Sequence, residues 1–243
     1  MSLTITGATA LRVLRQLRHD PRTVGLIVFV PCLLITLLKY VFYGSSVFDR
    51  IGGPLVGLFP LTSMFVVTSI TMLRERTTGT LERLMTMPLS KLDLLLGYGT
   101  AFALVAVMQA GLVSALAFGV LGLDVAGATW GVILLAVANA LLGMALGLFV
   151  SAFARTEFQA VQFLPAFILP QILLCGLLAP RDEMAELLYW ISWALPVTYA
   201  YSALDLVTRG VYGSELAAYV LVVCGFIVVA LVAGAATLRR RTA

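Results

Sequence analysis

Long apolar runs separated by short polar connections dominate the sequence. An α-helix needs roughly 20 mostly apolar residues to cross about 30 Å of bilayer hydrocarbon. Six runs meet this requirement: residues 23–43, 51–73, 94–121, 129–153, 160–178 and 216–238. The pattern predicts an all-α polytopic integral membrane protein with about six transmembrane helices.

The first 22 residues have a different pattern, with apolar and basic residues on opposite faces of a helix. The apolar face is formed by Ala10, Val13, Leu14 and Leu17. The basic face carries Arg12, Arg15 and Arg18. Residues 1–22 are therefore predicted to form an amphipathic interfacial helix, whose cationic face binds either anionic lipid headgroups or an acidic partner surface.

The segment 187–204 contains no charged residue, but Pro196 divides it into halves too short to cross a bilayer. It is rich in the aromatic residues that favour the membrane interface. The sequence thus predicts a broken, re-entrant pair of short helices within residues 180–209, between the fifth and sixth spans. Such a break is tolerated where protein or water satisfies the backbone.

The composition agrees with a bilayer environment. The 243 residues are 61% hydrophobic and 12% charged, and their mean hydropathy is +1.03. Six spans with short connections fill residues 1–243 as a single transmembrane domain and leave no room for a separate soluble catalytic domain.

The basic residues predict the orientation. With the spans above, one side receives 12 of the 16 lysines and arginines, namely Arg12, Arg15, Arg18, Arg22, Arg74, Arg76, Arg83, Lys91, Arg155, Arg239, Arg240 and Arg241. Cytoplasmic loops of membrane proteins carry an excess of such residues. Both termini and the loop 74–93 are therefore expected in the cytoplasm, and residues 180–209 outside.

Several kinds of chemistry lack the residues they need. The chain has one histidine, His19, and no H-E-x-x-H motif, so metalloprotease chemistry and histidine-ligated haem are not expected. It also lacks the phosphate-binding motif G-x-x-x-x-G-K-[ST]. We expect no catalytic residue, metal or cofactor in this chain, and a motor for uphill transport would have to be another subunit.

Neutral polar residues occur inside the spans, where acidic and basic residues are rare. They are Gln109, Asn139, Gln162 and Gln171. Two interpretations remain open: hydrogen bonding between helices, or lining of a polar or amphipathic pathway.

The longest predicted cytoplasmic loop carries the most specific motif. Residues 74–90 read RERTTGTLERLMTMPLS. This string resembles the R-E-R-x-x-G-T-L-E-x-L signature of type 2 ABC exporter permeases, followed by a proline and a small polar residue. The order of spans, the amphipathic N-terminal helix and the late segment LPVTY at 195–199 also match. Within that family the chain is similar to drug-efflux permeases of the daunorubicin-resistance type.

The resemblance implies that residues 74–93 form a coupling loop seated in a groove of a nucleotide-binding subunit. The matched positions are Arg74, Glu75, Arg76, Gly79, Thr80, Leu81, Glu82, Arg83, Leu84, Met85 and Pro88. Leucine and methionine at these spacings can form an apolar stripe beside charges suited to docking. Without the resemblance, a solvated charged connector is the simpler interpretation.

The family also has two short extracellular helices that form an outer gate. This expectation agrees with the broken segment predicted above. The corresponding candidate gate residues are Trp190, Trp193, Pro196 and Tyr199.

Together these features predict a non-catalytic permease subunit of a bacterial ABC exporter in the plasma (inner) membrane. Its expected partners are ATPase subunits that bind ATP and Mg, a second permease copy or paralogue, and membrane lipids, but no nucleic acid. Hydrophobic or amphipathic substrates, such as drugs or lipids, are expected. The alternatives are a membrane assembly protein that transports nothing and a small secondary carrier.

Overall fold

The computed structural model describes residues 3–80 and 91–237, and the secondary structure of these residues is entirely helical. Its elements are α1 (Leu3–Arg18), α2 (Pro21–Val41), α3 (Val47–Thr77), α5 (Lys91–Ser114), η1 (Ala115–Val120), α6 (Thr129–Val150), α7 (Glu157–Phe163), η2 (Leu164–Ile168), α8 (Leu169–Leu174), η3 (Arg181–Glu183), α9 (Glu186–Trp193), α10 (Pro196–Thr208) and α11 (Ser214–Ala236).

Six helical stretches are long and apolar enough to cross a membrane, which confirms the predicted all-α polytopic fold. They are Thr23–Val41, Val47–Thr77, Leu96–Val120, Thr129–Val150, Glu157–Leu174 and Ser214–Ala236. The fifth is built from α7, η2 and α8. Pro165 and Pro170 lie in it, and each lacks the N–H that a regular α-helix uses, so a π-helical segment joins two short α-helices.

Two helix boundaries differ from the predicted limits of the spans. The sequence places Arg74 at the start of a loop, but α3 continues to Thr77, and α5 begins at Lys91. Hydropathy ends a span at the first charged residue, whereas a helix continues as long as its backbone hydrogen bonds and side-chain partners remain favourable. The first three residues of the matched motif are therefore helical.

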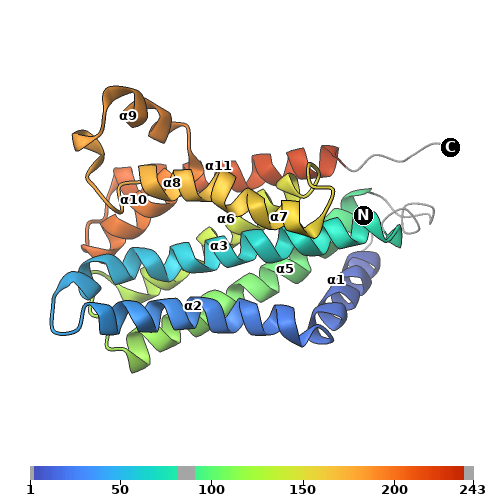
Figure 1. Cartoon of the computed structure of the whole chain (residues 1–243), viewed down its shortest axis with the longest axis horizontal. Coiled ribbons are helices and arrows are strands. Elements are labelled where there is room, and N and C mark those ends of the chain that lie inside the picture. Colours follow the sequence, from blue (N-terminus) through green and yellow to red (C-terminus); the bar gives the residue numbers. More distant parts are fainter. Residues whose placement is uncertain (1–2, 81–90, 238–243) are drawn as a thin grey trace.

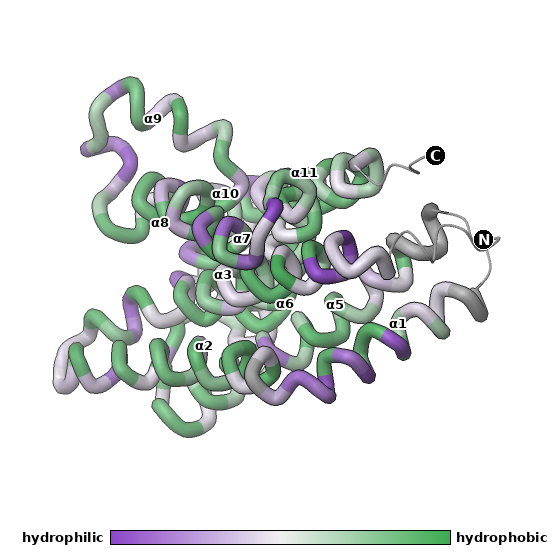
Figure 2. The backbone as a smooth tube through the Cα atoms, turned by 45° about the vertical axis from the view of Figure 1, so that its right-hand side comes forward, coloured by the Kyte–Doolittle hydropathy of each residue, from purple (hydrophilic) through white to green (hydrophobic). Residues whose placement is uncertain are grey.

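The long helices run side by side, and α1 lies at an angle to them near one end (Figure 1). We call this the basal end, defined by α1 and the last turns of α3 and α11. The apical end is defined by the turn between α2 and α3, by α9 and by the start of α11 (Figure 1). The long helices are mostly hydrophobic, whereas α1 carries a run of hydrophilic residues (Figure 2).

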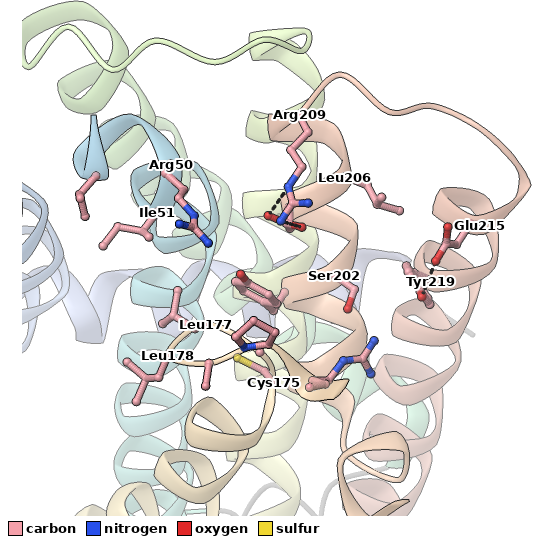
Figure 3. A pocket seen from close by; sticks show the side chains of 17 residues that line it. Arg50, Ile51, Cys175, Leu177, Leu178, Ser202, Leu206, Arg209, Glu215 and Tyr219 are labelled. Carbon is pink, nitrogen blue, oxygen red and sulfur yellow. Dashed lines mark hydrogen bonds and ion pairs between the residues drawn. The ribbon is translucent and has the colours of Figure 1, made fainter. Parts of the chain in front are cut away.

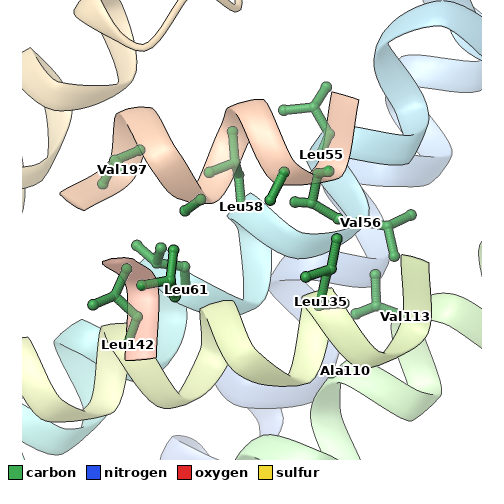
Figure 4. Packing of buried hydrophobic residues seen from close by; sticks show 14 of the residues in the cluster. Leu55, Val56, Leu58, Leu61, Ala110, Val113, Leu135, Leu142 and Val197 are labelled. Atoms are coloured by element: carbon green, nitrogen blue, oxygen red, sulfur yellow. The ribbon is translucent and has the colours of Figure 1, made fainter. Parts of the chain in front are cut away.

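The core is organised around α3 and α6, which pack directly against each other with α5 and α10 around them. Leu58 and Leu61 of α3, Leu142 of α6 and Val197 of α10 meet in one apolar cluster (Figure 4). Two glycines allow the close approach of the helices. A Cβ on Gly143 would lie 2.0 Å from the backbone oxygen of Leu61, and one on Gly147 would lie 2.4 Å from that of Phe65.

The amphipathic N-terminal helix is confirmed as a helix, and its apolar face packs on the bundle. Ala10, Val13 and Leu17 are buried in a cluster that includes Tyr98 and Phe102 of α5. The segment around Pro196 also forms two short helices, α9 and α10, as the sequence predicts. Because the structure contains no membrane, the depth of either segment in a bilayer stays a prediction.

The close contact between α3 and α6 predicts that replacing Gly143 with Ala will destabilise the fold. The added methyl group would overlap the backbone of Leu61, and overpacking of this kind costs about 1–3 kcal/mol. Thermal denaturation of the chain in a mild detergent measures the change. Gly111→Ala in α5 is the matched control, because its added Cβ has no described atom within 4 Å apart from its chain neighbours and the backbone of its own helix. Equal melting temperatures for the two variants would contradict this packing.

Candidate coupling site

The last turn of α3 lies at the basal end, where the helices on either side of the predicted coupling loop begin and end. Leu81, Glu82, Arg83, Leu84, Met85 and Pro88 of that loop lie outside the described residues. Before them, Gly79 has a φ of +70°, a left-handed conformation that favours glycine. The chain therefore turns at Gly79, directly after α3.

Glu75 lies in a buried network that joins three helices. Its side chain accepts a hydrogen bond from the Tyr98 hydroxyl at 2.8 Å and faces Nη1 of Arg12 at 3.4 Å. Arg12 also donates to the Tyr98 oxygen. Because Glu75 is only 6% exposed, its carboxylate already has partners within the chain. In this structure Glu75 therefore connects α3 to α1 and α5, and its role in coupling to an ATPase stays a prediction.

Arg74 lies one residue earlier and points to two other helices. Its Nε and Nη2 donate to the two carboxylate oxygens of Glu157, at 2.6 and 3.0 Å, in a bidentate pair at the start of α7. Its Nη1 contacts Asp20 at 3.2 Å. Arg74 thereby connects the end of α3 to the starts of α2 and α7.

Asp20 also caps α2. Its carboxylate accepts hydrogen bonds from the Thr23 hydroxyl at 2.7 Å and from the Thr23 backbone N–H at 3.2 Å. These bonds, the hydroxyl bond foremost, together with Arg74 hold the pKa of Asp20 below its ordinary value. The ionised carboxylate is the form that serves both the cap and the arginine.

Arg76 forms a contact on a third side of α3. Its Nη2 donates to the hydroxyl of Thr237 at 3.0 Å, directly after α11. Successive residues of an α-helix point about 100° apart, so three adjacent side chains reach in three directions. The triplet Arg74, Glu75 and Arg76 consequently connects α3 to α1, α2, α5, α7 and the end of α11.

The remaining basic residues of α1 are available at the surface. Arg15 and Arg18 are exposed, whereas Arg12 is half-buried in the network described above. A shallow hollow on α1 is lined by Ala8, Leu11, Arg12, Arg15, Gln16 and His19. The predicted cationic face therefore consists of Arg15 and Arg18, and Arg12 serves the bundle itself.

The four polar residues of the spans occupy different environments. Gln109 is buried and donates from Nε2 to the Ile27 carbonyl and to the Ser63 hydroxyl, both at 2.6 Å, so it bonds α5 to α2 and α3. Asn139 is buried beside Gly57. Gln171 is buried and donates to the Phe167 carbonyl, one turn earlier in its own span. Only Gln162 of the four is exposed, so in this structure the other three do not line an open path.

Two of the candidate gate residues, Trp193 and Tyr199, lie in one aromatic cluster at the apical end. The Tyr199 hydroxyl donates to the Trp193 carbonyl at 2.6 Å, and their ring centroids lie 5.9 Å apart. Tyr199 also contacts Tyr219 of α11, with ring centroids 5.9 Å apart. Pro196 is buried at the junction, and Trp190 is 64% exposed. The cluster holds α9 and α10 against α11.

Tyr98 is the residue of the basal network that the sequence did not reveal. It lies in an apolar run, where an aromatic residue is ordinary, and its partners are 23 and 86 residues away in the chain. The sequence offers one signal for this contact: a tyrosine lies near the start of a span, and an acidic residue lies at the end of the preceding span. That signal is weak without the structure.

Six candidate membrane-spanning helices, an amphipathic N-terminal helix packed on them and a charged triplet at the end of the second span define a polytopic membrane protein. Residues 6–207 match the family model described as ABC-2 type transporter, and this chain belongs to that family.

Curated relatives agree with the family. The chain is 28% identical over 145 residues to "Probable multidrug ABC transporter permease YbhR" of Escherichia coli (strain K12), covering 60% of this chain and 39% of the relative. It is 29% identical over 154 residues to "Inner membrane transport permease YhhJ" of the same strain, covering 62% and 41%. It is 25% identical over 182 residues to "ABC transporter G family member 20" of Dictyostelium discoideum, covering 74% and 25%.

The chain thus spans about two fifths of the length of the bacterial relatives and a quarter of the third. Membership of the family concerns the membrane-spanning part that they share. The activity, substrates and partners of the whole relatives do not follow from it directly.

The basal network predicts that Glu75→Ala will destabilise the fold. The substitution removes the acceptor of Tyr98 and the charge partner of half-buried Arg12, and loss of hydrogen bonds to a charged group costs about 1–3 kcal/mol. Thermal denaturation in detergent measures the loss. Arg15→Ala, one turn along α1 at an exposed position, should change stability by less than about 0.5 kcal/mol.

A double-mutant cycle tests whether Arg12 and Glu75 act together. If they do, Arg12→Ala combined with Glu75→Ala costs less than the sum of the two single losses. Strict additivity would show that the contact carries no energy.

Proposed function

We propose that this chain is the membrane-spanning permease of an ATP-driven exporter, with residues 74–93 as the loop that receives motion from a separate ATPase subunit. The observation that carries the proposal is the triplet at the end of α3. It connects the helix that leads into the loop to five other elements of the bundle. Force applied at the loop would therefore reach the whole basal end.

In this mechanism the chain performs no covalent chemistry. ATP and Mg bind to the ATPase subunits, and closure of these subunits pushes on the loop and on the exposed face of α1. The exposed Arg15 and Arg18 offer a cationic surface for an acidic partner. The proposed setting is a bacterial inner membrane with both termini in the cytoplasm, which puts the basal end on the ATPase side.

Hydrophobic or amphipathic molecules are the proposed substrates. A groove of about 290 Å³ lies between α2 and α3, beside Leu164 of η2, and its lining includes Leu26, Val30, Leu34, Phe59 and Val66. An adjoining hollow of about 170 Å³ shares Leu34, Phe59, Thr62 and Leu164 with it. An apolar lining with a few hydroxyl groups suits a weakly polar ligand. The word "multidrug" in the name of one relative agrees with this class.

A second permease copy or paralogue is the proposed membrane partner. The span formed by α7, η2 and α8 exposes Phe158, Val161, Phe167, Leu169 and Leu173. It also exposes Gln162, and a polar side chain in a span normally faces a partner or a cavity rather than lipid. This face is therefore assigned to the second copy and to the pathway between the copies.

Glu82→Ala tests the coupling role. In complexes reconstituted with the ATPase into vesicles, we expect transport to fall at least several-fold per ATP hydrolysed, while the chain still folds and assembles. Glu82 is a cleaner choice than Glu75, whose loss disturbs the fold. Arg155→Ala, an exposed charge in the turn between α6 and α7, is the control.

The result also separates the alternatives. Unchanged transport and ATP hydrolysis for Glu82→Ala would contradict the assigned loop. If the chain is purified in mild detergent and no ATPase copurifies with it, the alternative of an assembly protein is favoured. Transport that follows an ion gradient without ATP would favour a secondary carrier.

Cysteine crosslinking tests the second copy. In a variant whose cysteines, Cys32, Cys175 and Cys224, are replaced by alanine, Gln162→Cys should form disulfide-linked dimers in oxidised membrane vesicles. Val228→Cys on α11 is the matched control, because it is 59% exposed on another face and should remain monomeric. Equal crosslinking by the two variants would indicate random collision and remove the assigned interface.

A further inference from the structure

A polar cavity of about 410 Å³ lies at the apical end, apart from the basal network and from the apolar groove (Figure 3). Its walls come from the start of α3, the turn after α8, the last turns of α10 and the start of α11. Three arginines line it, Arg50, Arg181 and Arg209, together with the carboxylates Asp205 and Glu215.

The two carboxylates are already engaged. Asp205 pairs with Arg209 at 2.8 Å, and Glu215 accepts a hydrogen bond from the Tyr219 hydroxyl at 2.7 Å. Within residues 3–80 and 91–237, neither Arg50 nor Arg181 has a carboxylate within 4.0 Å. The cavity therefore holds two guanidinium groups that form no ion pair with this part of the chain.

Arg181 is held in place, and one nitrogen of its guanidinium group is buried without a hydrogen-bond partner. Its guanidinium carbon lies 4.4 Å from the centroid of the Trp193 ring, a cation–π contact that fixes the side chain. Its Nη1 is buried with no partner among the described residues. A buried donor without an acceptor is costly, and an anion in the cavity would supply that acceptor.

The local backbone brings this arginine to the cavity. Gly176 has a φ of +102°, and a Cβ there would lie 3.4 Å from both Cγ of Arg181 and Cε1 of Tyr201. A glycine at this turn thus allows the chain to reverse direction close to both side chains. Tyr201 and Ser202 add two hydroxyl groups to the lining.

We propose that this cavity is a binding site for a phosphate group, either free or on the headgroup of an amphiphile. Arg50 and Arg181 bind the anionic oxygens, and the hydroxyl groups of Tyr201 and Ser202 are additional donors. Guanidinium groups match the geometry of phosphate oxygens and form charge-assisted hydrogen bonds with them. The proposal concerns binding alone and does not depend on transport or on its direction.

Isothermal titration of the full chain in an uncharged maltoside detergent tests the site. Inorganic phosphate and dihexanoyl phosphatidic acid are the two probes, and dihexanoylglycerol is the control without phosphate. We expect saturable binding of at least one phosphate-bearing probe and none of the control. Binding of both probes shows that the phosphate group suffices, and binding of phosphatidic acid alone identifies an amphiphile headgroup.

Three variants locate the binding. Arg50→Gln at its exposed position should weaken binding about tenfold, and Arg181→Gln by at least as much, because each removes charge-assisted hydrogen bonds. Asp205→Asn should strengthen binding several-fold, because it removes a negative charge from the cavity and releases Arg209. Arg15→Gln at the basal end is the control for a general loss of positive charge.

Each result of these titrations either supports the phosphate site or overturns it. Weaker binding for Arg50→Gln together with tighter binding for Asp205→Asn supports the site, even if Arg181→Gln lowers stability. Absence of saturable binding by either phosphate-bearing probe would overturn the proposal. So would binding that Arg50→Gln and Asp205→Asn leave unchanged.

Discussion

The ion pairs and hydrogen bonds at the end of α3 hold the basal end of the bundle together. Charged groups beside a bilayer are costly unless they are paired or hydrated. Here three consecutive residues have partners on different elements. Arg74 bonds to Glu157 and Asp20. Glu75 bonds to Tyr98 and Arg12, and Arg76 bonds to Thr237. The position of α1 against the bundle follows from this arrangement together with its buried apolar face.

The two ends of the molecule use charge differently. At the basal end the charged groups of the triplet bond to side chains of other elements, and these bonds fix the helices relative to one another. At the apical end the carboxylates lining the cavity are engaged, but Arg50 and Arg181 form no ion pair with the described residues. The first arrangement suits transmission of force through the chain, and the second suits recognition of an anion.

Hydropathy predicted the spans well because the thickness of the bilayer sets a minimum length that short soluble helices do not reach. The break at Pro196 was predictable for an equally local reason, since proline lacks the backbone donor that a continuous helix requires. The extension of α3 to Thr77 was not, because the helix continues past the apolar run where its charged side chains find partners. Those partners are far away in sequence, 63 residues for Arg12 and Glu75 and 83 for Arg74 and Glu157.

The sequence predicted only part of the candidate site, again because the partners of its residues are far away in the chain. The motif located Arg74, Glu75 and Arg76, but their types alone do not distinguish a charge that docks a partner from one that pairs inside the chain. In the structure Glu75 pairs inside the chain, and this pairing depends on Tyr98 and α1. Likewise, the sequence left the role of Gln109 open, and its bonds to Ile27 and Ser63 show that it joins helices.

The crossing of α3 and α6 repeats itself along both helices. Gly143 faces Leu61 and Gly147 faces Phe65, so the two contacts are separated by four residues, about one helical turn, on each helix. A slide of α3 by one turn, about 5.4 Å, would again bring a glycine of α6 opposite a backbone carbonyl of α3 at one of the two positions. The other position would then bring Asn139 or Ser151, each of which carries a Cβ, against a backbone carbonyl, so the two glycines together fix one register of the crossing.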